Sequence, residues 1–281
     1  MENPIIRYLL IILLALCLPT LGQAQTNYPI PVFVSILPLK YFVKRIGGNN
    51  VDVTVMVGPG QEPETYEPEP QKMSRLSDAR LYYRIGVPFE NTYMQRLEQI
   101  NPKMKVIDLR QKITLRHTTI GTDPHIWTSP PLVMIMAKTI RNSLITIDPE
   151  GKNIYEKGYN DFIVDLKKLH QTIQHKLQPL HQREFMVFHP AWGYFADTYN
   201  MKQIAIETEG KEAGPKDLQK FIHLAKEKNI KTIFIQTQFN KTQAKMIARA
   251  AGADIKSMDP LAENYLNNMY NVANTLASEI K

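Results

Sequence analysis

The chain has 281 residues, which is enough for one large domain or two modest ones. Hydrophobic residues make up 43% and charged residues 22% of the sequence, as in ordinary globular proteins, and this excludes a disordered chain. The net charge of +7 comes from dispersed basic residues that do not alternate with aromatic ones, so we expect no nucleic-acid partner.

The N-terminus has the features of a secretory signal peptide. Arg7 precedes an apolar run over residues 8–18, and the small-residue site Gly22-Gln23-Ala24 follows. We predict that residues 1–24 are removed and that the mature protein is periplasmic or otherwise extracytoplasmic. The one cysteine, Cys17, follows the bulky Leu16, which favours a soluble exported protein over a lipoprotein. The mature chain then has no thiolate to bind metal.

The first half of the mature chain alternates short apolar runs with helical patterns. Strands are predicted at residues 30–36, 51–57, 81–85 and 106–109. Helices are predicted at residues 39–46, 73–76, 89–100 and 131–145, and the polar residues 111–122 are predicted to form a loop. This alternation is typical of parallel βαβ units.

A long helical stripe follows, from Asp148 to Pro179. Asp148-Pro149 predicts its N-terminus, and Pro179 its end. About thirty residues at 1.5 Å each would make a rod of roughly 45 Å. Its apolar residues recur every three or four positions: Tyr155, Tyr159, Phe162, Ile163, Leu166, Leu169, Ile173 and Leu177. The stripe predicts either a surface helix of a single domain or a rigid helix that joins two lobes.

The alternation resumes after this helix. Strands are predicted at residues 185–188, 203–206, 232–236 and 255–258, and helices at 191–199, 215–228, 241–251 and 264–280. We therefore predict an α/β fold of two lobes, each a small parallel sheet flanked by helices, bridged by one long helix. The predicted divisions are an N-terminal lobe over residues 25–147, the linking helix over 148–180, and a C-terminal lobe over 181–281.

Candidate metal ligands stand beside prolines in the loops of both lobes. They are Glu64, His125, His189 and Asp259, two before the long helix and two after it. Because ligands of open parallel sheets bind beyond the carboxyl ends of the strands, these loops are the expected place for a site. Two imidazoles and two carboxylates suit a divalent first-row metal. The residues alone also allow capping histidines, a simple Asp-Pro turn and a solvated glutamate.

Several separated segments resemble the periplasmic metal-binding proteins of zinc and manganese ABC importers. The segments are residues 60–68 (GQEPETYEP), 123–127 (DPHIW), 188–195 (FHPAWGYF) and 258–261 (MDPL). The resemblance implies two α/β lobes bridged by a long helix, with a metal held between them by Glu64, His125, His189 and Asp259. This sequence departs from the family in having Glu64 where a histidine is usual. It also has only His117 in the 111–122 segment, where many zinc-specific members carry a histidine-rich loop.

The implied function is capture of a divalent metal and its delivery to an ABC permease in the membrane, by a monomer that is not an enzyme. Zinc is favoured and manganese comes next. One alternative is a protein that binds a siderophore or corrinoid chelate, which Trp127, Trp192 and Tyr194 would suit. Another is a metallohydrolase with Glu64 or Glu207 as general base, although no H-E-x-x-H motif supports it.

Overall fold

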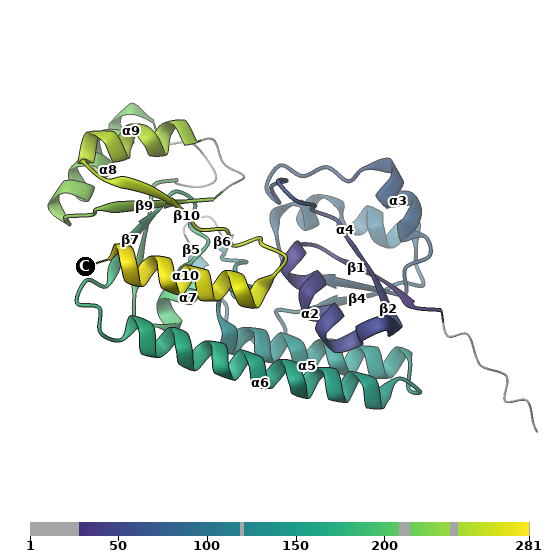
Figure 1. Cartoon of the computed structure of the whole chain (residues 1–281). Helices are drawn as coiled ribbons and strands as arrows, with labels where there is room; N and C mark the ends of the chain where they lie inside the picture. Colours follow the sequence, from purple (N-terminus) through teal and green to yellow (C-terminus); the bar gives the residue numbers. More distant parts are fainter. Residues whose placement is uncertain (1–27, 119–120, 208–213, 237–240, 281) are drawn as a thin grey trace, which may run out of the picture.

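The computed structural model describes residues 28–118, 121–207, 214–236 and 241–280 (Figure 1). The predicted signal peptide, with Cys17, lies outside these ranges. The described residues form two α/β lobes that lie side by side above a pair of long helices (Figure 1).

The N-terminal lobe is built on a four-stranded parallel sheet. Its strands are β1 (Ile30–Val34), β2 (Val51–Val55), β3 (Leu81–Arg84) and β4 (Lys105–Asp108), in the order β2-β1-β3-β4. The helices between them are α2 (Leu37–Gly47), η1 (Gly48–Asn50), α3 (Pro70–Leu76) and α4 (Pro88–Ile100). The central strand β1 is almost wholly buried, which explains its nearly continuous apolar sequence.

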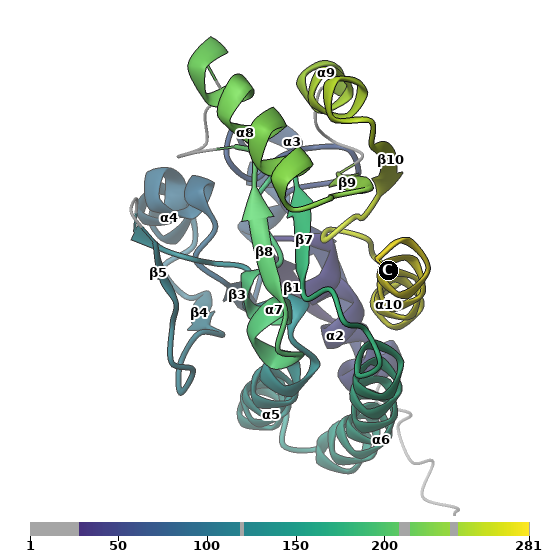
Figure 2. The ribbon, with the colours of Figure 1, turned by 90° about the vertical axis from the view of Figure 1, so that its left-hand side faces the viewer.

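The C-terminal lobe repeats this topology. Its strands are β7 (Glu184–Val187), β8 (Lys202–Ala205), β9 (Thr232–Ile235) and β10 (Asp254–Ser257), in the order β10-β9-β7-β8. Its helices are α7 (Gly193–Thr198), α8 (Pro215–Glu227), α9 (Lys241–Ala251) and α10 (Tyr265–Glu279). In both lobes the first and third strands are neighbours in the middle of the sheet. Helices α8 and α9 lie at the end of this lobe remote from α5 and α6 (Figure 2).

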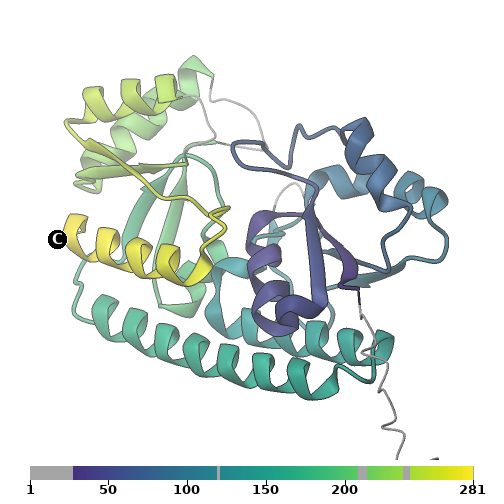
Figure 3. The ribbon, with the colours of Figure 1, turned by 45° about the vertical axis from the view of Figure 1, so that its right-hand side comes forward.

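Helix α6 (Lys152–Leu177) runs beneath both lobes, and the antiparallel helix α5 (Pro130–Ile147) lies beside it beneath the N-terminal lobe (Figure 3). Helix α6 has 26 residues and is therefore about 39 Å long. Six of the eight predicted apolar positions are buried in it: Tyr155, Phe162, Leu166, Leu169, Ile173 and Leu177. The predicted fold class of two parallel α/β lobes with a long bridging helix is confirmed.

The bridging helix begins four residues later than the sequence predicts, at Lys152. Asp148 instead follows the last residue of α5, and its carboxylate accepts hydrogen bonds from the Gly151 amide at 3.3 Å and the Tyr155 hydroxyl at 2.5 Å. An Asp-Pro pair suits either side of a helix boundary, and here the carboxylate closes the turn between α5 and α6.

The loop predicted at residues 111–122 contains a short hairpin. Its antiparallel strands, β5 (His117–Thr118) and β6 (Gly121–Thr122), have two residues each. The segment after it forms a single 3-10 turn, η2 (Ile126–Thr128). Strands this short show no alternation of apolar and polar residues, so the sequence pattern could not predict them.

A shared apolar core joins the two lobes on the side of α6. The Phe42 ring of α2 lies 5.6 Å from Phe162 of α6 and 4.9 Å from Tyr265 of α10, between ring centroids. These three aromatic residues are at most 2% exposed. Lys40 of α2 also forms a 2.7 Å ion pair with Glu263, which precedes α10. Elements of both lobes therefore pack on the same helix, which opposes a wide hinge motion between them.

Candidate metal centre

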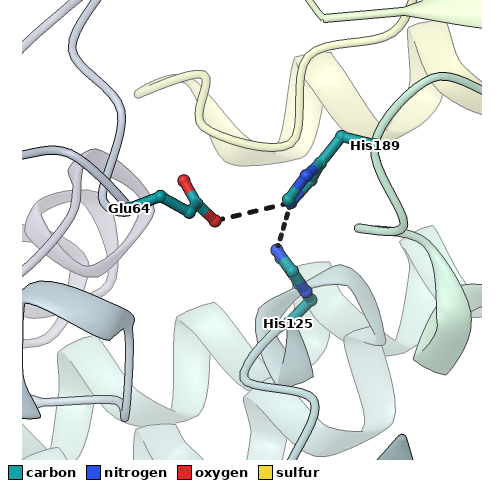
Figure 4. A group of neighbouring side chains, drawn as sticks. All are labelled: Glu64, His125 and His189. Atoms are coloured by element: carbon teal, nitrogen blue, oxygen red, sulfur yellow. Dashed lines mark hydrogen bonds and ion pairs between the residues drawn. The ribbon is translucent and has the colours of Figure 1, made fainter. Parts of the chain in front are cut away.

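Three of the four predicted ligands meet between the lobes (Figure 4). Glu64 lies in the loop between β2 and α3, His125 directly precedes η2, and His189 follows β7. One ligand atom from each lies within 4.8 Å of the other two. The two Nε2 atoms are 3.3 Å apart, and the Nε2 of His189 is 3.6 Å from the Oε1 of Glu64. Both imidazoles are buried, with His125 8% and His189 7% exposed.

The orientation of His125 is set by its own loop. The Oδ1 atom of Asp123 accepts hydrogen bonds from the His125 amide at 3.0 Å and from its Nδ1 at 2.8 Å. Burial raises the pKa of Asp123, but these bonds and the charges of His125 and Arg116 outweigh it and lower that pKa. An ionised Asp123 holds the proton of the neutral ring on Nδ1, so that the lone pair of Nε2 faces Glu64 and His189.

His189 is held in the same way from the neighbouring strand. Its Nδ1 lies 2.8 Å from the Oε2 of Glu207, which is 7% exposed. Burial lowers the pKa of His189, but the hydrogen bond to Glu207 and the charges of Glu64 and Glu207 raise it overall. His189 and Glu207 follow β7 and β8, which pair in parallel with Val187 opposite Ala205. This shared position after paired strands is the sequence signal that could have identified Glu207 as the partner of His189.

Glu64 belongs to a loop that apolar contacts fix against the N-terminal lobe. The carbonyl of Pro63 accepts a 3.2 Å hydrogen bond from the amide of Phe89, whose ring lies 5.2 Å from that of Tyr66. Glu62 of the same loop lines the cavity between the ligands. Burial, followed by the charge of Glu64, raises the pKa of Glu62 to about 7. No pattern in the sequence sets Glu62 apart from Glu67 and Glu69 of the same loop.

Asp259 lies outside this group. Its Oδ1 accepts a 2.8 Å hydrogen bond from the amide of Leu261, and its main-chain carbonyl accepts one from Asn268 at 2.6 Å. The next residue, Pro260, does line the cavity, and its carbonyl accepts a 2.8 Å bond from the Nε1 of Trp127. The structure thus brings the segment of Asp259 to the site without placing its carboxylate in the cluster.

The cavity between the ligands is small. Its volume is about 10 Å³, which is close to the space of one water molecule. Drug-sized ligands occupy pockets of about 300–1,000 Å³. The residues lining the cavity are Glu62, Pro63, Glu64, Val87, His125, Trp127, His189, Gln236, Pro260 and Leu261. Trp192 and Tyr194 are not among them, and both are buried in the shared core. The space therefore fits a single ion.

Two α/β lobes of the same strand order, joined on one side by a shared core, with convergent imidazole and carboxylate groups between them, define a two-lobed solute-binding protein. Residues 32–279 match the family ZnuA, described as the periplasmic zinc-uptake complex component A. The chain belongs to this family.

Relatives in the family carry names for both zinc and manganese. The chain is 28% identical over 240 residues to the manganese-binding lipoprotein MntA of Halalkalibacterium halodurans, covering 83% of this chain and 80% of that protein. It is 28% identical over 251 residues to the high-affinity zinc uptake system protein ZnuA of Bacillus subtilis, covering 82% and 78%.

Solved structures agree with the fold. A crystal structure of ZnuA is 41% identical, with a TM-score of 0.88, and the match covers 90% of this chain and 100% of that one. A zinc-bound deletion mutant of ZnuA is also 41% identical, with a TM-score of 0.86, and the match covers 90% of this chain and 98% of that one. The laminin-binding protein Lmb of Streptococcus agalactiae is 26% identical, with a TM-score of 0.82, and the match covers 90% of this chain and 100% of that one. Within the described ranges, no helix has both the length and the apolar character needed to cross a membrane.

Proposed function

We propose that this protein captures a divalent transition metal outside the cytoplasm and delivers it to an ABC-type permease. The observation that carries the proposal is the cluster of Glu64, His125 and His189, whose ligand atoms lie within 4.8 Å of one another. Each imidazole turns Nε2 into the cluster because a buried carboxylate holds its Nδ1. Such carboxylate–histidine pairs are typical of metal sites.

The charges around the cavity favour a cation. Glu62, Glu64 and Glu207 act together on His189. Arg116 lies on the far side of Asp123, with its Nε 3.4 Å from the Oδ2 atom. A dication would offset the mutual repulsion of the carboxylates in a site where burial weakens screening.

Zinc is the favoured ion and manganese the next. Two imidazoles and a carboxylate at close range suit tetrahedral Zn²⁺, whereas carboxylate oxygens also suit the harder Mn²⁺. The described residues contain no cysteine, so the site has no soft thiolate that would select copper(I). The zinc and manganese names of the relatives support the same pair of ions.

The size and contacts of the site count against the two alternative functions. A cavity of about 10 Å³ has no room for a siderophore or a corrinoid. A metallohydrolase would need a general base beside the metal. Glu207 is instead hydrogen bonded to His189, and Glu64 is itself in the ligand cluster. These contacts favour binding of a single ion, and the match to a family of zinc-uptake components supports its delivery to a permease.

We also propose that the signal peptide over residues 1–24 directs export, and that the mature protein acts as a monomer without a lipid anchor on Cys17. Division of the chain at residues 147/148 and 180/181 also remains a proposal. Asp259, predicted from the sequence, is one of two candidates for a fourth ligand, and the other is Glu62, which lines the cavity.

The test is metal analysis of the purified mature protein, followed by competitive titration with Zn²⁺ and Mn²⁺ against a chromophoric chelator. We expect one ion per chain and tighter binding of zinc. His125→Ala and His189→Ala should lose tight binding, whereas His117→Ala should not, because His117 is exposed on the hairpin. Stoichiometric metal in both cavity variants would refute the site, and a protein without affinity for either ion would refute the function.

A further inference from the structure

The cavity contains a carboxylate that the proposed ligand set leaves unused, that of Glu62. Glu62 lies two residues before Glu64 and lines the same cavity. Its Oε1 atom is buried and has no hydrogen-bond partner within the described part of the chain. Leaving a buried polar atom without a partner costs roughly 1–3 kcal/mol, so such an atom points to a missing interaction.

The surroundings of Glu62 favour a cation as that missing partner. Its side chain is close enough to Glu64, His189 and Glu207 to interact electrostatically with all three. Two of these neighbours are carboxylates, and neither Lys nor Arg is among them. A hydrogen-bond donor could satisfy one oxygen, whereas a cation would also offset the repulsion between the carboxylates of Glu62 and Glu64.

Asp259, the other candidate for the fourth ligand, differs from Glu62 on both counts. It does not line the cavity. One of its carboxylate oxygens is already hydrogen bonded to the Leu261 amide at 2.8 Å. Moving Asp259 onto the ion would break this bond, whereas moving the Oε1 of Glu62 breaks none.

We propose that Glu62, rather than Asp259, supplies the fourth ligand to the captured ion. This inference rests on the proposed function, because it concerns the same ion held by Glu64, His125 and His189. Glu62 is outside the 4.8 Å group, so its side chain turns toward the ion on binding. The resulting site has two imidazoles and two carboxylates, which makes it formally neutral with a dication. A second hard oxygen ligand also extends the range of the site from zinc toward manganese.

The first arm of the test compares zinc affinities by competitive titration. Loss of a partner in the shell outside the ligands typically weakens metal binding ~10–100-fold. Loss of a ligand should reach the upper end, so we expect a loss of about 100-fold for Glu62→Gln. Glu67→Gln is the matched control, because Glu67 is an exposed carboxylate of the same loop and its variant loses the same charge. We expect both Glu67→Gln and Asp259→Asn to bind zinc within about threefold of the wild type.

The second arm is a crystal structure of the zinc-loaded wild-type protein, which separates a ligand from a distant charge. A Glu62 oxygen about 2.0–2.2 Å from zinc is expected. An Asp259 oxygen or a water in that position would overturn the assignment, even if Glu62→Gln weakens binding. Unchanged affinity in Glu62→Gln would overturn it as well. Failure of the function itself is distinct, because the wild-type protein would then bind neither Zn²⁺ nor Mn²⁺.

Discussion

Glu207 provides the sharpest test of how the protein orients His189, one of the proposed ligands of the metal ion. The Glu207 carboxylate lies 2.8 Å from the Nδ1 of His189, and the two side chains are 5% and 8% exposed. Solvent and salt therefore screen this pair weakly. Glu207→Gln keeps an oxygen that can accept the Nδ1 proton but removes the charge, whereas Glu207→Ala removes both.

The size of the effect follows from what each variant loses. In Glu207→Gln the imidazole keeps its tautomer but becomes a weaker base, and we expect zinc affinity to fall ~10-fold, or about 1.4 kcal/mol. In Glu207→Ala the ring is also free to turn, and we expect the fall to approach ~100-fold. Asp123→Asn is the comparison on the other imidazole, at the same 2.8 Å. Arg116 already offsets part of the charge of Asp123, so Asp123→Asn should cost less than Glu207→Gln.

The assay is competitive zinc titration at about pH 7.5, with circular dichroism and urea unfolding of each metal-free variant as folding controls. The expected order of affinity is wild type, Asp123→Asn, Glu207→Gln, Glu207→Ala. A larger loss for Asp123→Asn than for Glu207→Gln would refute the charge argument. Wild-type affinity in Glu207→Ala would refute the orienting role altogether.

Four further outcomes follow from the contacts of the site and the core. Zinc affinity should fall as pH is lowered, and because the pKa of His189 is raised, the fall should begin above pH 6.5; constant affinity down to about pH 5 would contradict histidine ligation. The folding stability of the metal-free protein should depend on pH in the opposite direction. Because the pKa of His189 is raised in the folded state, protonated His189 stabilises the fold below pH 6.5, and this contribution is lost as the pH rises through the raised pKa. Trp127→Phe removes the 2.8 Å donor to the Pro260 carbonyl and should cost about 2 kcal/mol in urea unfolding, where an unchanged midpoint would show that the bond contributes nothing. Glu90 is fully buried and ion-paired, so Glu90→Gln should cost about 3 kcal/mol, while the exposed Glu98→Gln on the same helix should stay within ~0.5 kcal/mol.

The elements of the fold could be predicted because the spacing of apolar residues agrees with the residues that begin and end helices and strands. Strand β1 is apolar without interruption, and helix α6 carries its buried residues at intervals of three, four and seven. Asp148-Pro149 suits either side of a helix boundary, and there the predicted start of the helix is four residues too early. A proline beside each residue marked the loops of His125 and His189. His189 follows strand β7, as expected for a site at the carboxyl end of a parallel sheet, whereas His125 follows the antiparallel hairpin β5–β6, so the sheets alone do not explain why the two imidazoles meet.

Side-chain direction within a loop could not be predicted from the sequence. Asp259 and Glu62 illustrate this, since both are carboxylates beside a proline. Asp259 bonds the amide two residues ahead, as aspartates in turns commonly do. Glu62 has a longer side chain and reaches the cavity. The sequence alone assigns such residues to the loop, and the contacts in the structure show which of them lines the cavity.

The shared core also limits how the ion can leave. Separating the lobes would expose Phe42, Phe162 and Tyr265, each at most 2% exposed. Uncovering a large side chain costs roughly 1.5–3 kcal/mol, so a wide hinge opening would cost several kcal/mol. When water replaces both partners, breaking the Trp127–Pro260 bond costs only about 1 kcal/mol, which is less than in Trp127→Phe, where the carbonyl is left without its donor. Breaking it loosens the segment beside His125. Release of the ion by rearrangement of the cavity loops, with the lobes still joined at α6, is therefore the less costly path.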